Sequence, residues 1–190
     1  MPRVIESPED FTVIGENIHA TRVVLRNGRR AVTLEDGTEA VPFKTESGEQ
    51  RHLTVPEWYR RTQPYDQGQI KHFLIAMMKG ISDDPREQEE GASYIKAEVR
   101  RQVRNGADYL DMNVDEVHYD VEIQKRAMRW TVSTVQEVSE VPPCIDSSLS
   151  EIIAVGLDAY DGGAGRPLLN SVAFERLDCL DMAVEHNARI

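Results

Sequence analysis

The chain has 190 residues, of which 22 are Lys or Arg and 33 are Asp or Glu, and its formal net charge is −11. This length suits one domain, and the negative charge disfavours binding to the phosphate backbone of a nucleic acid. Two cysteines cannot form a disulfide scaffold, and no apolar run reaches the roughly 20 residues that a membrane span needs. We therefore expect a cytoplasmic protein that binds neither nucleic acid nor membrane.

The first predicted elements are β-strands. An apolar, β-branched run at 11–18 is typical of a buried strand. Between 21 and 56 the chain then carries four short strand-like pieces, at 22–25, 31–34, 39–43 and 52–55. Asn27-Gly28, Asp36-Gly37 and Ser47-Gly48 separate these pieces and favour tight hairpin turns. The pattern predicts an antiparallel β-meander at 21–56, inserted after the first strand.

Helical periodicity begins near Ile70 and predicts a helix that ends near Gly80. Asp83 or Asp84 can cap a second helix, which has Pro85 in its first turn. Strands and helices then alternate, with strands at 107–114, 143–146 and 167–170 and helices at 121–138, from Ser148 onward and through 174–184. This alternation predicts a parallel sheet with right-handed crossovers.

The length of the repeating unit indicates the architecture. A (β/α)8 barrel takes roughly 31 residues for each βα unit, so four units fit the chain once the meander is set aside. We expect an α/β domain over 1–190 that forms the first four βα units of a TIM barrel, with the insert at 21–56. An open doubly wound sheet is the alternative, but the sequence after Gly15 does not fit the G-x-G-x-x-G loop of its nucleotide-binding forms.

Polar residues follow each of the four predicted strands of the sheet. They are Glu16 and Asn17, Asp111 and Asn113, Asp146 and Ser147, and Asn170 and Ser171. Any one of them is explained as well by a helix cap or a turn. Because ligands of parallel α/β folds bind at the carboxyl ends of the strands, the four together predict a polar pocket there.

The residue types restrict the ligand. Carboxylates and carboxamides lack the positive charge that a phosphate needs, whereas they suit a heterocycle with an amino group, ring N–H groups and a carbonyl. A metal bound by Glu16, Asp111 and Asp146 is the competing interpretation. We rank it lower and predict no metal, because Asn and Ser are weak ligands and no H-x-x-x-H or C-x-x-C pair is present. His19 is a further candidate for contact with the pocket.

Several stretches resemble the pterin-binding family that includes methyltetrahydrofolate:corrinoid methyltransferases and dihydropteroate synthase. They lie at 13–18, 105–114, 143–148 and 168–172. The segment 130–140 is similar to the methyltransferase branch, and the resemblance covers 11–20 and roughly 85–190. It implies a TIM barrel with a folate in its open mouth.

The resemblance also implies roles for the strand-end residues. Asp146 and Asn170 would hydrogen-bond the pterin ring, and Asp111 and Asn113 would line or support the same pocket. Further possible pocket residues are Glu16, Asn17, His19, Ser147 and Ser171. The implied reaction moves a methyl group between N5 of methyltetrahydrofolate, or tetrahydrofolate, and a corrinoid such as cobalamin. Since the chain lacks an Asp-x-His-x-x-Gly signature, a separate partner protein would carry the corrinoid.

Three alternatives stay open: a dihydropteroate synthase-like condensing enzyme, a non-catalytic pterin-binding paralogue and an inactive fragment. The synthase branch carries Asn-x-Thr-Pro-Asp-Ser-Phe after its first strand, where this chain has Glu16-Asn-Ile-His-Ala. A half barrel would leave a strand edge unpaired, so we expect a homodimer or a complementary C-terminal half. We also expect the insert to overhang the mouth of the barrel as a lid or a docking element for the corrinoid protein.

Overall fold

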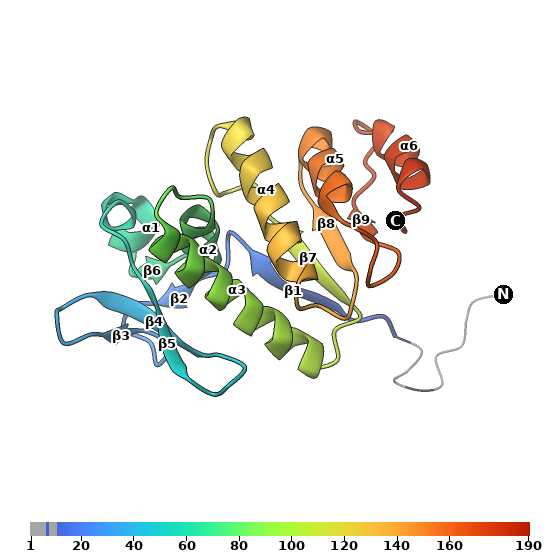
Figure 1. Cartoon of the computed structure of the whole chain (residues 1–190). Coiled ribbons are helices and arrows are strands. Elements are labelled where there is room, and N and C mark those ends of the chain that lie inside the picture. The colour runs from blue at the N-terminus through green and yellow to red at the C-terminus, as the bar shows by residue number, and fades with distance from the viewer. Residues whose placement is uncertain (1–6, 8–10) are drawn as a thin grey trace.

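A computed structural model describes residue 7 and residues 11–190; the other residues of the predicted 1–190 domain lie outside this part. Its central sheet has four parallel strands in the order β1 (Ile14–His19), β7 (Tyr109–Asn113), β8 (Pro143–Asp146) and β9 (Leu168–Asn170) (Figure 1). The predicted α/β class is confirmed, and the arrangement is compatible with part of a TIM barrel. That the chain forms the first four βα units of such a barrel stays a prediction.

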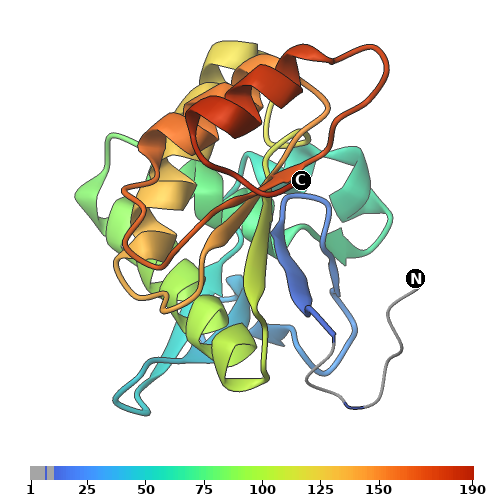
Figure 2. The same cartoon turned by 90° about the vertical axis from the view of Figure 1, so that its right-hand side faces the viewer.

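The main helices lie on one side of this sheet, as Figure 2 shows. They are α2 (His72–Gly80), α3 (Pro85–Arg104), α4 (Val121–Gln136), α5 (Ser150–Ala159) and α6 (Asp178–Glu185). Asp84 caps α3 as predicted, because its Oδ1 accepts a 2.8 Å hydrogen bond from the Arg86 N–H. Ser148 does not cap α5, since Leu149 occupies the position before that helix. Within the described residues, no helix is both long enough and apolar enough to cross a bilayer.

The core lies between the sheet and these helices. The strand side chains that face the helices are Leu110, Met112, Ile145 and Leu169, all of them buried. Gly156 lets α5 approach the sheet closely, because a Cβ there would lie 2.5 Å from Cγ2 of Ile145. Since strand side chains alternate between faces, the polar residues at neighbouring positions point to the side of the sheet on which the described residues form no helix.

The segment between β1 and α2 forms two small sheets. Three of the four predicted pieces make an antiparallel sheet of β3 (Val32–Thr33), β4 (Glu39–Lys44) and β5 (Gln50–Thr54). The first piece differs from the prediction, because β2 (Val24–Leu25) pairs with β6 (Gln69–Ile70). Ile70 therefore belongs to a strand, although its spacing predicted a helix. A 3-10 turn, η2 (Tyr59–Arg61), and a short helix, α1 (Gln63–Asp66), connect β5 to β6.

The β4–β5 hairpin lies along the outside of α3 (Figure 1). Arg51 donates hydrogen bonds of 2.8 Å to Ser93 and 2.9 Å to Glu89. Near the hairpin tip, Glu46 pairs with Arg100 at 2.9 Å, close to the end of α3 that leads into the start of β7. These contacts hold the β4–β5 hairpin against a helix and direct its tip away from the carboxyl ends of the strands, so this part of the insert at 21–56 does not overhang the mouth as expected. A docking role of the insert stays a prediction.

On the opposite flank, at α6, apolar side chains are exposed among the described residues. The helix predicted through 174–184 begins only at Asp178, so Phe174 lies in the turn before it. Phe174 and Val184 are 90% and 83% exposed. At the adjacent sheet edge, Arg189 forms a parallel bridge with Leu168, and the Leu169 N–H donates to the Arg189 carbonyl at 2.8 Å. Arg189 thus continues the backbone hydrogen bonding of the sheet beyond β9.

Candidate functional site

The register of the sheet aligns one polar residue from each strand at the carboxyl edge. His19 of β1 pairs with Asn113 of β7, Asn113 pairs with Asp146 of β8, and Asp146 pairs with Asn170 of β9. We call these four residues the polar row. Three of the four were the sequence-predicted pterin contacts, and the fourth is His19. Backbone pairing therefore brings together side chains that are up to 151 positions apart in a chain of 190 residues.

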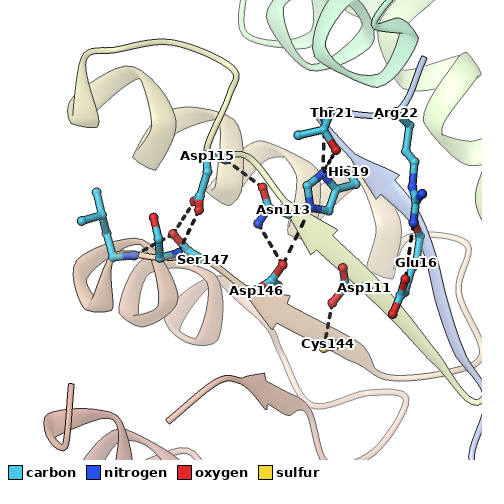
Figure 3. Close-up of polar contacts among 12 residues, drawn as sticks. Glu16, His19, Thr21, Arg22, Asp111, Asn113, Asp115, Cys144, Asp146 and Ser147 are labelled. Atoms are coloured by element: carbon cyan, nitrogen blue, oxygen red, sulfur yellow. Dashed lines mark hydrogen bonds and ion pairs between the residues drawn. The ribbon is translucent and has the colours of Figure 1, made fainter. Parts of the chain in front are cut away.

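The orientation of Asn113 is defined by two hydrogen bonds (Figure 3). Its Oδ1 accepts from the Asp115 N–H at 3.0 Å, and its Nδ2 donates to Oδ2 of Asp146 at 2.8 Å. Because a backbone N–H can only donate, the first bond fixes which end of the amide faces Asp146. Asn113 therefore holds the Asp146 carboxylate in place.

Asp111 and Cys144 lie two residues before Asn113 and Asp146 in their strands, and their side chains are on the same face of the sheet. Asp111 is 3% exposed, and its Oδ1 accepts a 3.1 Å hydrogen bond from the Cys144 thiol. Burial raises the pKa of Asp111, while hydrogen bonds from Cys144 and Asn170 act in the opposite direction. Burial likewise raises the pKa of Cys144, which keeps its sulfur protonated as a donor. Cys144 itself is fully buried.

The Asp146 carboxylate is more accessible than that of Asp111. Burial raises the pKa of Asp146, the hydrogen bond from Asn113 lowers it, and the nearby charge of Asp111 raises it again. Two carboxyl groups in a partly desolvated site are strong acceptors for neutral N–H groups. The pair therefore suits a ligand that can present several N–H donors to one edge of the sheet.

His19 faces Asp146 with one ring nitrogen and Thr21 with the other (Figure 3). Its Nδ1 accepts from the Thr21 N–H at 3.2 Å, and Oγ1 of Thr21 is 2.7 Å away. A neutral ring with an accepting Nδ1 carries its proton on Nε2, which lies 3.9 Å from Oδ2 of Asp146. Among the described residues, His19, Asp111 and Asp146 offer ligand atoms that lie within 4.8 Å of one another, so the competing metal interpretation applies here with His19 in place of Glu16.

Glu16 and Asn17 lie at the rim, in an irregular part of β1 where the register shifts between Gly15 and Ile18. Glu16 is exposed and pairs with Arg22 at 3.4 Å. The Asn17 side chain is also exposed, and its backbone N–H donates to Oε1 of Gln102 on α3 at 3.3 Å. The structure thus places Glu16 beside the polar row and ties the Asn17 backbone to the helix layer.

Ser147 connects the loops behind the row. Its hydroxyl donates to Asp115 at 2.5 Å, and its carbonyl accepts from Arg176 at 2.5 Å. Ser147 is buried and committed to these bonds, whereas Ser171 is exposed. Sequence reasoning missed Asp115 and Arg176. The alternation Asp111-x-Asn113-x-Asp115 could have indicated the first, but no pattern marks the second.

The sequence model of one known family, described as pterin binding enzyme, matches residues 82–190. The match covers more than half of the chain and includes Asp111, Asn113, Asp146 and Asn170, while β1 with His19 lies outside it. Acceptor-rich strand ends on an open sheet face agree with the pterin or folate type of ligand that this family implies. Both the matched residues and the site that they build therefore show that the chain belongs to the pterin binding enzyme family.

Proposed function

We propose that the polar row binds the pterin ring of a folate, and that the site serves methyl transfer between N5 of that folate and a corrinoid on a separate protein. The observation that carries the proposal is the aligned set Asn113, Asp146 and Asn170, backed by the buried Asp111. A pterin offers an amino group, ring N–H groups and a carbonyl. Carboxylates accept from the first two, and a carboxamide can donate as well as accept.

The residues have separable tasks in this proposal. Asp146 accepts from the amino group and a ring N–H, Asn170 completes the contact on β9, and Asn113 orients Asp146. Asp111 contributes a second acceptor at the base of the site. When the C–N bond at N5 breaks, N5 takes up a proton from solvent, so that tetrahydrofolate leaves as a neutral amine. The protein's part is to orient the folate in a site where hydrogen bonds are stronger than in water.

The charges around the row favour an uncharged ring over a phosphate-bearing ligand. Among the described residues, Arg22 is paired with Glu16, and Arg176 donates to the Ser147 carbonyl. Within the part of the chain that the structure describes, the carboxylates of the row therefore have no adjacent uncommitted guanidinium that could hold a phosphate. The first strand also ends in Glu16-Asn-Ile-His-Ala, which supports the methyltransferase branch over the synthase branch.

A corrinoid would supply cobalt(I), the nucleophile that accepts the methyl group. The histidine nearest to a corrinoid-binding signature in this chain, His118, accepts at Nδ1 from the Asp120 N–H at 3.0 Å and stacks on Tyr119. Its neighbours do not match Asp-x-His-x-x-Gly, so the residues present do not fit a resident corrinoid. In this proposal a separate partner protein binds the cobalamin and brings it to the folate.

Calorimetry with the purified chain tests the binding step. We expect methyltetrahydrofolate and tetrahydrofolate to bind, and Asp146→Asn and Asn170→Ala each to weaken binding by about 10-fold. Asp108→Asn is the matched control, since Asp108 lies at the opposite end of β7 and accepts from the Val13 N–H. Unchanged affinity in both site variants would contradict the assignment of the row.

A second assay tests the reaction. The chain is mixed with methyltetrahydrofolate and cobalt(I) cobalamin without oxygen, and formation of methylcobalamin is followed by absorbance. Transfer that depends on Asp146 supports the proposal. Folate binding combined with formation of dihydropteroate instead would favour the synthase-like alternative, and binding without either reaction would favour a non-catalytic paralogue.

A further inference from the structure

A cavity of about 180 Å³ lies on the helix side of the sheet, where the end of α4 meets the start of β8 (Figure 1). Its inner wall is apolar and comes from three elements: Met112 of β7, Val132 and Val135 of α4, and Pro143 of β8. All four side chains are buried. Because an engineered apolar cavity of about 150 Å³ holds a benzene ring, this one has room for a six-membered ring with a short substituent.

Hydrogen bonds fix the loop that forms the outer wall of this cavity. Oε1 of Gln136, the last residue of α4, accepts from the Asp161 N–H at 3.1 Å. The Tyr160 hydroxyl accepts from the Ala164 N–H at 3.0 Å and donates to the Gly165 carbonyl at 3.0 Å. The loop after α5 is therefore bonded both to α4 and within itself, so the cavity is preformed and a ligand that enters it need order little of the protein.

The rim of the cavity is negatively charged. Glu140 and Asp161 line it and are exposed, and the described lining residues include no lysine, arginine or histidine. Neither carboxylate is ion-paired within the part of the chain that the structure describes, whereas the nearby Glu137 pairs with Lys96. An apolar wall beside two unpaired carboxylates suits a ligand that has an apolar body and one positive charge.

We propose that this cavity binds a small aromatic amine, whose ring packs against Val132 and Val135 and whose ammonium group lies at the rim near Glu140 and Asp161. The ring removes the apolar wall from water, and the ammonium group donates charge-assisted hydrogen bonds to the carboxylates. The cavity and the polar row are on opposite faces of the sheet, so this inference does not depend on the proposed pterin binding.

The test is an NMR titration of the isotope-labelled chain with benzylamine and with neutral benzyl alcohol, at neutral pH and about 150 mM salt. We expect amide shifts confined to the segments that line the cavity, and about 10-fold tighter binding of benzylamine. The double variant with Glu140→Gln and Asp161→Asn should abolish this preference. Ala164→Leu, on a partly exposed loop, should fill the cavity and weaken binding of both probes by about 10-fold or more.

The matched control is a double variant with Glu137→Gln and Asp158→Asn, because it removes two exposed negative charges that do not line the cavity. It should leave both affinities unchanged. Circular dichroism melts confirm that each variant folds. Shifts spread over the acidic surface, or an equal loss of preference in the two double variants, would show unspecific attraction of the amine and overturn the proposal. Unchanged binding in folded Ala164→Leu, or no shifts with about 10 mM of either probe, would also overturn it.

Discussion

Asn113 donates a 2.8 Å hydrogen bond to Oδ2 of Asp146, so the end of one strand orients the carboxylate at the end of the next. The Asp115 N–H fixes the Asn113 amide from the other side at 3.0 Å. The carboxylate is thus positioned before any ligand binds, so less side-chain conformational entropy is lost on binding.

Asn113→Asp should destabilise the fold at neutral pH by about 1–3 kcal/mol, because it sets a second carboxylate against Asp146 in place of a donor. The loss should shrink toward about pH 5, where a shared proton can restore a hydrogen bond between the two groups. Urea unfolding at both pH values measures it, with the exposed Asn27→Asp as control. An equal effect of the two substitutions at every pH would contradict the orienting role.

His72 should make the fold less stable in acid. Burial, followed by the charges of Arg30 and Arg101, lowers the pKa of His72 to about 3, and its Nδ1 lies 2.8 Å from the Tyr94 hydroxyl. Between about pH 6.5 and 3 the unfolded chain binds a proton here that the folded chain does not, so stability falls as the pH falls.

The expected loss from this residue approaches about 1.4 kcal/mol for each pH unit. His72→Gln should flatten the acid side of a plot of unfolding free energy against pH. Parallel curves for the original chain and His72→Gln would show that His72 does not stay neutral in the folded state.

Lys79 anchors the insert from within the core. It is 4% exposed, pairs with Glu90 and donates to Oγ1 of Thr54 at 2.6 Å, while Glu90 also accepts from the Thr54 N–H at 2.7 Å. Lys79→Met should cost about 3 kcal/mol in urea unfolding, because it leaves a partly buried carboxylate without its cation.

The double variant with Lys79→Met and Glu90→Gln should recover part of this loss, since no unpaired charge remains. Lys125→Met is the control for a surface pair, because its partners Glu122 and Glu151 are largely exposed. It should cost less than about 1 kcal/mol. A loss as large as that of Lys79→Met would contradict the argument from burial.

The apolar flank of α6 should make the 190-residue chain self-associate and bind hydrophobic dye. Replacing Phe174 and Val184 together by Ser should lower both effects, because these side chains are among the most exposed apolar groups. Sedimentation at increasing concentration and dye fluorescence measure the change. Tyr119→Ser, on the exposed loop between β7 and α4, is the control. A monomeric original chain that binds no dye would contradict the prediction.

Local patterns predicted much of the secondary structure and the acidic part of the site. Asp84 and Pro85 marked the start of α3, and the alternation of apolar runs and helical stripes placed β7, β8 and β9 within one or two residues. Asp111 and Asp146 were found because they end apolar strands. These features depend on residues a few positions apart, which is the range over which backbone periodicity and capping act.

The sequence by itself thus determined the α/β class, the order of the strands and helices along the chain and the polar strand ends. Only the tertiary structure decided that His19 stands level with Asn113, that Ser147 is committed to Asp115, and that the insert packs on α3 through Arg51. Each of these depends on contacts between residues 30 or more positions apart. Strand register and ion pairs over such separations are selected by packing in three dimensions, and no local period in the sequence encodes them.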